Sequence, residues 1–182
     1  MTVPLESERL LLRPVTLADA PSLQRHFAHW SIIGRLSTAV PWPYPDDGMV
    51  THLAGHVLPG VDAGRLMAWS LVPKQGTLAG EAAGLLVYRL HSDDHRGFWL
   101  AESLWGQGLM TEAITCFQDH VFFDLGVERL VVHNAVANLA SRRVKEKTGA
   151  VWLAHVQIDH RGGSDAEQWE ITRDRWAELR GR

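Results

Sequence analysis

The sequence predicts an α+β fold: a mixed, mostly antiparallel seven-stranded sheet with helices on both faces. Three observations carry this prediction. Apolar stretches with strand character follow one another without a helix over residues 65–101 and again over 151–173, which favours antiparallel pairing. Segments with helical periodicity separate the fourth, fifth and sixth strands. A helix that connects two consecutive strands is typical of a parallel pair, so one parallel pair is expected within the sheet.

The first third of the chain is expected to hold one strand and two helices. Residues 5–15 alternate as a strand does, and Thr16 can cap a helix over 16–30, whose apolar side chains recur at helical spacing. The proline-rich segment 41–45 interrupts regular structure, and a short helix over 48–58 follows it.

The remaining elements are expected in a fixed order: strands at 65–73, 77–90 and 96–101, a helix at 109–126, a strand at 128–133, a helix at 138–150, and strands at 151–159 and 166–173. A turn around Gly76 joins the first two of these strands, and Gly126 ends the longer helix. The last residues, 172–182, continue as a short helix or fray.

Composition limits the possible classes of function. A length of 182 residues suggests one domain over residues 1–182. The net charge of −3 offers no broad basic surface for nucleic acid or an anionic membrane. A single cysteine allows neither an internal disulfide nor a multi-cysteine zinc site. No apolar run reaches the roughly 18 residues of a membrane span, and the acidic first residues do not resemble a secretory signal, so a cytoplasmic location is expected.

The most informative stretch is 98–113, where a strand leads into Trp105-Gly106-Gln107-Gly108 and a helix begins at once. Glycines permit positive φ and close approach of a ligand to the backbone, and the first turn of a helix presents free N–H groups to an anion. Glycines that serve only the geometry of the turn are the alternative. The third glycine of a dinucleotide fingerprint is absent, since Thr111 stands there.

A second candidate site lies about thirty residues on. Asn138 can cap the helix that follows it, and Ser141 lies one turn inside that helix. Arg142 and Arg143 could reach a further phosphate. A capped helix with a solvated, charged face is the alternative interpretation.

Together these stretches resemble the GNAT superfamily of acyl-CoA N-acyltransferases, most closely its RimJ/RimL-type branch. The family's Gln/Arg-x-x-Gly-x-Gly/Ala motif is matched from Ser103 to Gly108, with Ser103 as a departure. The motif Asn-x-x-Ser-x-Arg-Val-x-Glu-Lys-x-Gly is matched from Asn138 to Gly149. The resemblance implies the GNAT fold, in which a central parallel strand pair splays apart to hold coenzyme A.

The resemblance also implies where acetyl-CoA, the co-substrate, binds, and it implies no metal. The pantetheine arm is expected along the backbone of the fourth strand, the pyrophosphate on the glycine turn, and the remainder against the later helix. The residues implied are Trp99, Leu100, Trp105, Gly106, Gln107, Gly108, Leu109, Met110, Thr111, Asn138, Ser141, Arg142 and Arg143.

Two proton transfers need side chains. The leaving thiolate needs a donor, and Lys145 stands where many family members have a tyrosine, so Ser141 is the predicted acid. The acceptor amine must lose a proton. His133 stands where related enzymes have a glutamate and is the first candidate base, with Glu102 as the second. A histidine and a serine with purely structural hydrogen bonds are the alternatives.

The predicted function is acetyl-CoA-dependent N-acetylation of a primary amine by direct attack, the acceptor being a protein N-terminal α-amine or a small amine. Trp30, Trp42 and Tyr44 lie in the segment that roofs the acceptor site in this family, although simple packing would also explain them. A non-catalytic acyl-CoA sensor and a transferase that uses succinyl-CoA are the alternatives. A homodimer is a possible assembly.

Two further groups of histidines stand out in the sequence. His52 and His56 have the spacing of a helical metal pair but lack an evident third ligand. His91 and His95 flank two aspartates in a predicted loop, for which we favour a solvated polar loop.

Overall fold

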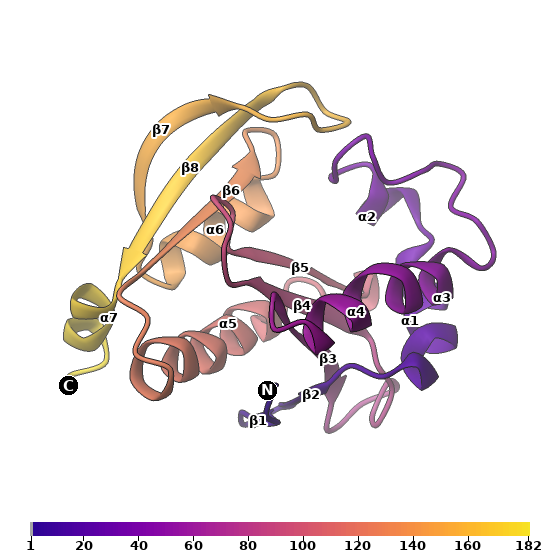
Figure 1. Ribbon diagram of the computed structural model, residues 1–182, viewed down its shortest axis with the longest axis horizontal. Helices are drawn as coiled ribbons and strands as arrows, with labels where there is room; N and C mark the ends of the chain where they lie inside the picture. The colour runs from indigo at the N-terminus through magenta and orange to yellow at the C-terminus, as the bar shows by residue number, and fades with distance from the viewer. Residues whose placement is uncertain (1) are drawn as a thin grey trace.

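A computed structural model describes residues 2–182, whose strands form two antiparallel sheets (Figure 1). The first sheet contains, in spatial order, β1 (Leu5–Glu6), β2 (Leu10–Pro14), β3 (Leu66–Pro73), β4 (Gly84–Arg89) and β5 (Arg96–Leu100). The second contains β6 (Arg129–Ala135), β8 (Asp165–Thr172) and β7 (Val151–Gln157), with β8 in the middle.

The α+β class is confirmed, but the strands differ from the single seven-stranded sheet that the sequence predicts. The opening strand is divided by a turn closed by the Ser7 N–H and the Leu10 carbonyl (3.0 Å), so that β1 folds back on β2. Between β5 and β6 the sheet is interrupted. Within residues 2–182 their backbones are joined by one bond, from the His95 N–H to the Val131 carbonyl (2.9 Å). Beyond it the strands diverge, which is the predicted splay (Figure 1).

Helices cover both faces of the first sheet. On one face lie α1 (Ala20–Phe27), α2 (Trp30–Ile33), α3 (Gly48–His52) and α4 (Leu58–Asp62), and on the other lies α5 (Leu109–Asp119). After the splay come α6 (Leu139–Lys147) and α7 (Arg173–Leu179). The single helix expected over 16–30 is broken because His29 adopts an extended conformation before α2 begins. Single π-helical turns, Leu53–Val57 and His120–Asp124, continue α3 and α5.

The strand expected to begin at residue 77 begins at Gly84 instead. Gly76 and Gly80 both have positive φ, 87° and 80°, and the Gly80 N–H bonds back to the Pro73 carbonyl (2.9 Å). These left-handed positions make residues 74–83 a folded loop rather than a tight turn between two long strands.

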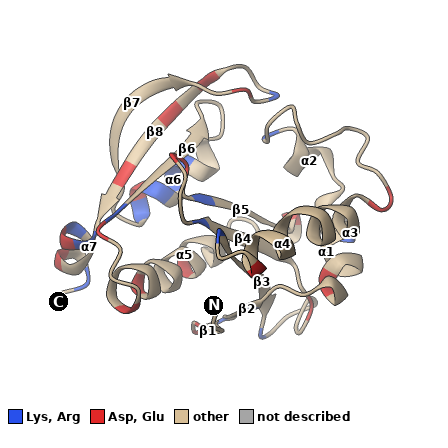
Figure 2. Ribbon diagram, viewed as in Figure 1, with Lys and Arg blue, Asp and Glu red and all other residues tan. Residues whose placement is uncertain are grey.

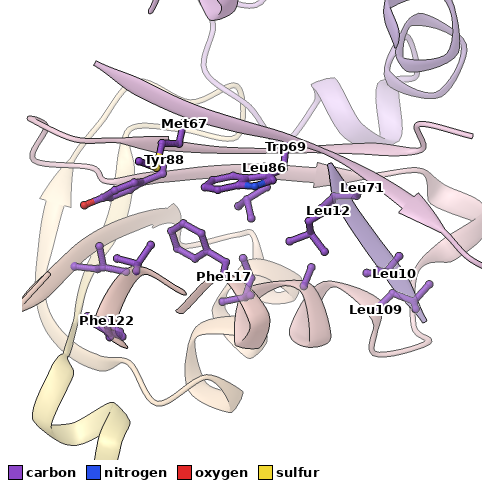
Figure 3. Close-up of a cluster of buried hydrophobic side chains, with 14 of the residues drawn as sticks. Leu10, Leu12, Met67, Trp69, Leu71, Leu86, Tyr88, Leu109, Phe117 and Phe122 are labelled. Carbon is purple, nitrogen blue, oxygen red and sulfur yellow. The ribbon is translucent and has the colours of Figure 1, made fainter. Parts of the chain in front are cut away.

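The larger core lies between the first sheet and α5 (Figure 3). Phe117 of α5 is completely buried and packs edge-on against Trp69 and Tyr88, with ring centroids 5.8 and 5.6 Å apart. Such aromatic packing stabilises a fold by several kcal/mol in total. Leu109, the first residue of α5, belongs to the same core as Leu100, the last residue of β5, which holds the N-terminus of the helix beside the end of the strand.

The tip of the β7–β8 hairpin reaches across to the segment after α2, and Figure 1 shows the two approaching each other. The Arg161 N–H bonds to the Leu36 carbonyl (3.0 Å), and Thr38 bonds to Asp159. The second sheet is thereby tied to the helical layer of the first, across the side where β5 and β6 separate. In residues 2–182, no helix has the length and apolar character needed to cross a membrane.

Candidate functional site

The glycine turn, residues 105–108, and the first turn of α5 carry backbone N–H groups that donate no hydrogen bond within residues 2–182. Gly106 and Gly108 both have positive φ, 74° and 79°, and α5 begins at the next residue. The backbone N–H groups of residues 106–111 donate no hydrogen bond to any group in residues 2–182. A Cβ built on Gly106 would meet no atom within 4 Å, so the space before it is open. Free N–H groups at a helix N-terminus, facing open space, suit a pyrophosphate.

Arg9, which sequence reasoning missed, lies beside this turn. Its guanidinium donates to the Gln107 carbonyl (3.0 Å) and pairs with Glu112 in the first turn of α5 (2.7 Å). Its positive charge therefore offsets a carboxylate that would otherwise repel an anion at the helix N-terminus. This contact joins residues about a hundred positions apart in the sequence, so no local sequence pattern predicts it.

The open edge of β5 comes next to the glycine turn. Hydrogen bonds at both ends of the β4–β5 pair, from Arg89 to His95 and from Ala101 to Ala83 (both 2.8 Å), fix the alternation of the ladder. This alternation turns the N–H and C=O groups of Trp99 toward β4, and those of its neighbours toward the gap before β6.

This geometry corrects one expected residue. The predicted pantetheine contacts were the backbone groups of Trp99 and Leu100, but the groups of Trp99 face β4 and are not available at the open edge. Those of Phe98 and the Leu100 N–H take that place, whereas the Leu100 carbonyl accepts a hydrogen bond from the Trp105 indole (2.7 Å). The Trp99 side chain packs on Phe27, in the core beneath α1.

At the other side of the gap, Asn138 caps α6 as predicted, because its Oδ1 accepts the Ser141 N–H (3.2 Å). The two arginines behind it differ. Arg142 is engaged by Glu146 (2.9 Å) and by buried Glu167 of β8 (3.1 Å). Arg143 is exposed and has no ion pair within residues 2–182, so it is the freer of the two for a phosphate. Figure 2 shows basic positions on α6 and acidic positions along the neighbouring strand β8.

The predicted acid, Ser141, has a partner that the sequence did not reveal. Lys145, one turn further along α6, donates from Nζ to the Ser141 Oγ at 2.9 Å. Only 1% of Lys145 is exposed. Burial, and then the charge of nearby Arg96, lower the pKa of the Lys145 ammonium to about 7, although Asp94 and Glu167 act in the opposite direction.

Lys145 should reduce the stability of the protein at neutral pH. Its folded pKa lies below its unfolded value of 10.5, so folding disfavours the charged form. This cost is complete below about pH 7 and disappears as the pH rises toward 10.5. We expect Lys145→Met to raise the free energy of unfolding by about 1–4 kcal/mol at pH 7, with the gain vanishing near pH 10. Denaturant unfolding at both pH values measures this, and a less stable variant at pH 7 would refute it.

The predicted base, His133, lies on β6 at the start of the splay. Its side chain is 8% exposed, and its Nδ1 lies 3.5 Å from the Asp94 carboxylate, which also accepts the His133 N–H (3.2 Å). Burial tends to raise the pKa of Asp94, but His133 and Arg89 lower it below its ordinary value. Nδ1 makes no hydrogen bond within residues 2–182, but the nearby Asp94 carboxylate favours a proton on Nδ1 and leaves Nε2 as the nitrogen able to accept one.

The loop that contains Asp94 is solvated in part, as expected from the sequence, since His91 and Asp93 are exposed, but its last two residues are attached to the neighbouring strand. Asp94 is held by His133 and Arg89, and the His95 ring accepts the Val131 N–H (3.0 Å). Both residues attach the start of β5 to β6. The other pair, His52 and His56, stacks ring on ring at 5.6 Å. Across residues 2–182, no three side chains capable of binding a metal converge.

The second candidate base, Glu102, belongs to a different part of the site. It is exposed after the end of β5 and accepts the Ser31 hydroxyl of α2 (2.7 Å). No hydrogen bond or ion pair joins the Glu102 side chain to His133 or Ser141 within residues 2–182. It stands instead near the aromatic segment around α2.

Of the three predicted acceptor aromatics, two are open to solvent. Trp30 and Trp42 are 52% and 43% exposed, and their rings lie 5.2 Å apart. The Arg161 guanidinium lies 5.8 Å from the Trp30 ring, so the hairpin tip helps to fix this pair. Tyr44 packs edge-on against Phe27 at 4.9 Å and serves the core beside them.

Comparisons with known proteins agree with this geometry. Residues 9–151 match the family model described as an acetyltransferase (GNAT) domain. No curated protein sequence matches the chain. Solved structures share the fold, among them RimL, described as a ribosomal L7/L12 alpha-N-protein acetyltransferase in complex with coenzyme A. It is 19% identical, covers 93% of this chain and 97% of its own, and has a TM-score of 0.77.

Two further structures are similar over most of their length. RimJ from Mycobacterium smegmatis, in complex with a coenzyme A disulfide, is 22% identical over 98% of this chain and 93% of its own, with a TM-score of 0.76. Ribosomal-protein-S5-alanine acetyltransferase from Vibrio fischeri is 17% identical over 96% and 98%, with a TM-score of 0.78. With its fold shared by these enzymes and its family model matched over most of its length, the chain belongs to the GNAT acetyltransferase family and is an N-acetyltransferase.

Proposed function

We propose that the protein transfers the acetyl group of acetyl-CoA to a primary amine, either the α-amine of a protein N-terminus or a small amine. The unused N–H groups of residues 106–111 carry this proposal, since they form an anion cradle at the end of a strand whose edge is open. Asn138 and Arg143 of α6 complete the cofactor site from the opposite side of the splay.

The pantetheine arm extends a strand. It pairs with the open-edge groups of Phe98 and Leu100, because a chain with amide groups can take the place of a neighbouring strand. The thioester is thereby brought between β5 and β6, near His133 on one side and Ser141 on the other. The amine attacks the thioester carbonyl directly, the C–S bond breaks, and no covalent enzyme intermediate forms.

An α-amine suits this site better than a lysine side chain does. With a pKa of about 8, roughly a tenth of an α-amine is neutral at pH 7, whereas a free lysine is neutral about 0.04% of the time. His133, which lies beside Asp94, removes the remaining proton. RimL and the alanine acetyltransferase are described as acting on ribosomal proteins, which makes a protein N-terminus the first acceptor to try.

The acceptor enters beside α2. The Trp30–Trp42 pair offers an apolar wall there, and the Glu102 carboxylate attracts a cationic amine from beside it. A peptide end or a small amine fits a wall of this kind, which is built from two exposed aromatic rings and one charge.

Release of free thiol tests the proposal. The protein is incubated with acetyl-CoA, or separately with succinyl-CoA, and a panel of short peptides and small primary amines. We expect thiol release that requires both acetyl-CoA and an acceptor. Saturable binding of acetyl-CoA without turnover on any acceptor would contradict an enzyme of this specificity and favour an acyl-CoA-binding module. Faster release from succinyl-CoA would overturn the choice of acyl group.

A further inference from the structure

Lys145 is an unusual residue in the core of this protein. A buried ammonium normally has a carboxylate within contact distance, because desolvation of an unpaired charge is costly. No carboxylate lies within 4.0 Å of the Lys145 Nζ in residues 2–182, and the hydrogen bond to the Ser141 Oγ is the one that the side chain makes. Packing alone does not explain a lysine at this position, since an apolar side chain would fill the same space.

Three charged groups lie near Lys145, from β5, from the loop before it and from β8. Arg96 of β5 is buried and donates to Gln118 of α5 (3.0 Å), and Asp94 precedes β5. Glu167 of β8 is also buried and accepts from Asn134. Burial and Arg96 lower the pKa of Lys145, while Asp94 and Glu167 raise it, so the group can change protonation state near neutral pH.

The direction of the hydrogen bond determines what Ser141 can do. An ammonium group has only donors, so the Ser141 oxygen is the acceptor. The hydroxyl hydrogen makes no hydrogen bond within residues 2–182 and remains available to another acceptor. Ser141 is partly exposed in the first turn of α6, next to Asn138 and at the edge of the splay. Lys145 lies behind it, away from solvent.

We propose that Lys145 supplies the proton that neutralises the departing thiolate, and that the Ser141 hydroxyl delivers it. This inference rests on the proposed function. As the C–S bond breaks, the sulfur takes the hydroxyl hydrogen of Ser141, and the Ser141 oxygen takes a hydrogen from the Lys145 ammonium. The products are the CoA thiol, an intact serine and a neutral lysine. After the thiol leaves, water returns the proton along the same path.

The Lys145–Ser141 pair explains why a lysine can stand at position 145, where many family members have a tyrosine. The Lys145 ammonium behind Ser141 can replace the proton that the hydroxyl gives away, which an isolated hydroxyl cannot do. Direct donation from Lys145 is prevented by its burial, so both residues are needed. The charge of Lys145 should therefore affect the ionisation of the CoA sulfur, although Lys145 does not contact that atom.

A measurement on bound CoA tests this without turnover. The thiol of CoA is titrated in the complex by the ultraviolet absorbance of its thiolate, with wild type, Lys145→Met and Lys147→Met. Lys147 is exposed on the same helix and is the matched control. The Lys145 ammonium and a thiolate beside Ser141 stabilise each other, so the two groups titrate as a coupled pair. We therefore expect the bound thiol to ionise at a lower pH in wild type and in Lys147→Met than in Lys145→Met. The same thiol pKa in all three proteins would overturn the proposal.

The pH dependence of kcat gives a second test of the proton path from Lys145 through Ser141. In wild type, kcat should fall as the pH rises through the pKa of Lys145, and in Lys145→Met this falling limb should be lost together with about 100-fold of kcat at pH 7. Ser141→Ala leaves the buried lysine in place and should cause a similar loss. The double variant should be no slower than either single variant, because the two residues act as one unit.

Other outcomes have defined meanings. Additive losses in the double variant, or an acetyl group found on Ser141 by mass spectrometry, would overturn the proton path. A wild-type protein that binds CoA and lowers its thiol pKa, but transfers no acetyl group, would support the path from Lys145 to sulfur and refute the proposed function instead.

Discussion

Gly106→Glu should weaken the affinity for acetyl-CoA by at least 100-fold. The new carboxylate would project into the open space before the free N–H groups of residues 106–111 and occupy the anion site from within the chain. It would also repel the pyrophosphate. Calorimetric titration of the folded variant with acetyl-CoA measures the loss.

Gly126→Glu is the matched control. Gly126 also has a positive φ, 69°, and also has open space around its Cβ position, but it lies beyond the other end of α5. The two substitutions therefore carry the same backbone strain, about 1 kcal/mol. Normal binding by Gly106→Glu, or equal losses in both variants, would contradict an anion cradle at the glycine turn.

His133→Gln should lower kcat by about 100-fold at pH 7, because the acceptor amine then has no side chain to take its proton. The deficit should shrink as the pH rises above the acceptor's own pKa, about 8 for an α-amine, since the neutral amine becomes abundant without help. A pH–rate profile for both proteins, at saturating acetyl-CoA, measures this.

His155→Gln serves as the control, because His155 is an exposed histidine on the edge strand β7. It should behave as wild type at every pH. An unchanged pH–rate profile in His133→Gln would remove His133 as the base, and Glu102→Gln would then be the next variant to test.

Local patterns in the sequence predicted much of the fold and part of the cofactor site. The order of strands and helices from β3 onward follows from apolar periodicity, and the glycine turn and the Asn138 cap follow from residue types whose conformational roles are specific. Each of these features depends on residues within a few positions of one another, which is the range over which spacing is informative.

The features that the sequence did not reveal depend on contacts over long distances in the chain. The choice between Trp99 and Phe98 at the open edge is decided by the register with β4. Arg9 reaches the glycine turn from the first sheet's edge. Lys145 and Ser141 have a spacing that allows contact on a helix, but only the packing of β5, β8 and α5 around Lys145 shows that it is buried.

The most direct test of the proposed activity is the position of the acetyl group in the product. The protein is incubated with acetyl-CoA and peptides that each carry one free α-amine and one lysine, together with small primary amines, and the products are located by mass spectrometry. We predict acetyl groups on α-amines, or on small amines of similar pKa, with lysine side chains unmodified. Acetylation of lysines at comparable rates, or of no acceptor by protein that binds acetyl-CoA, would contradict the assignment.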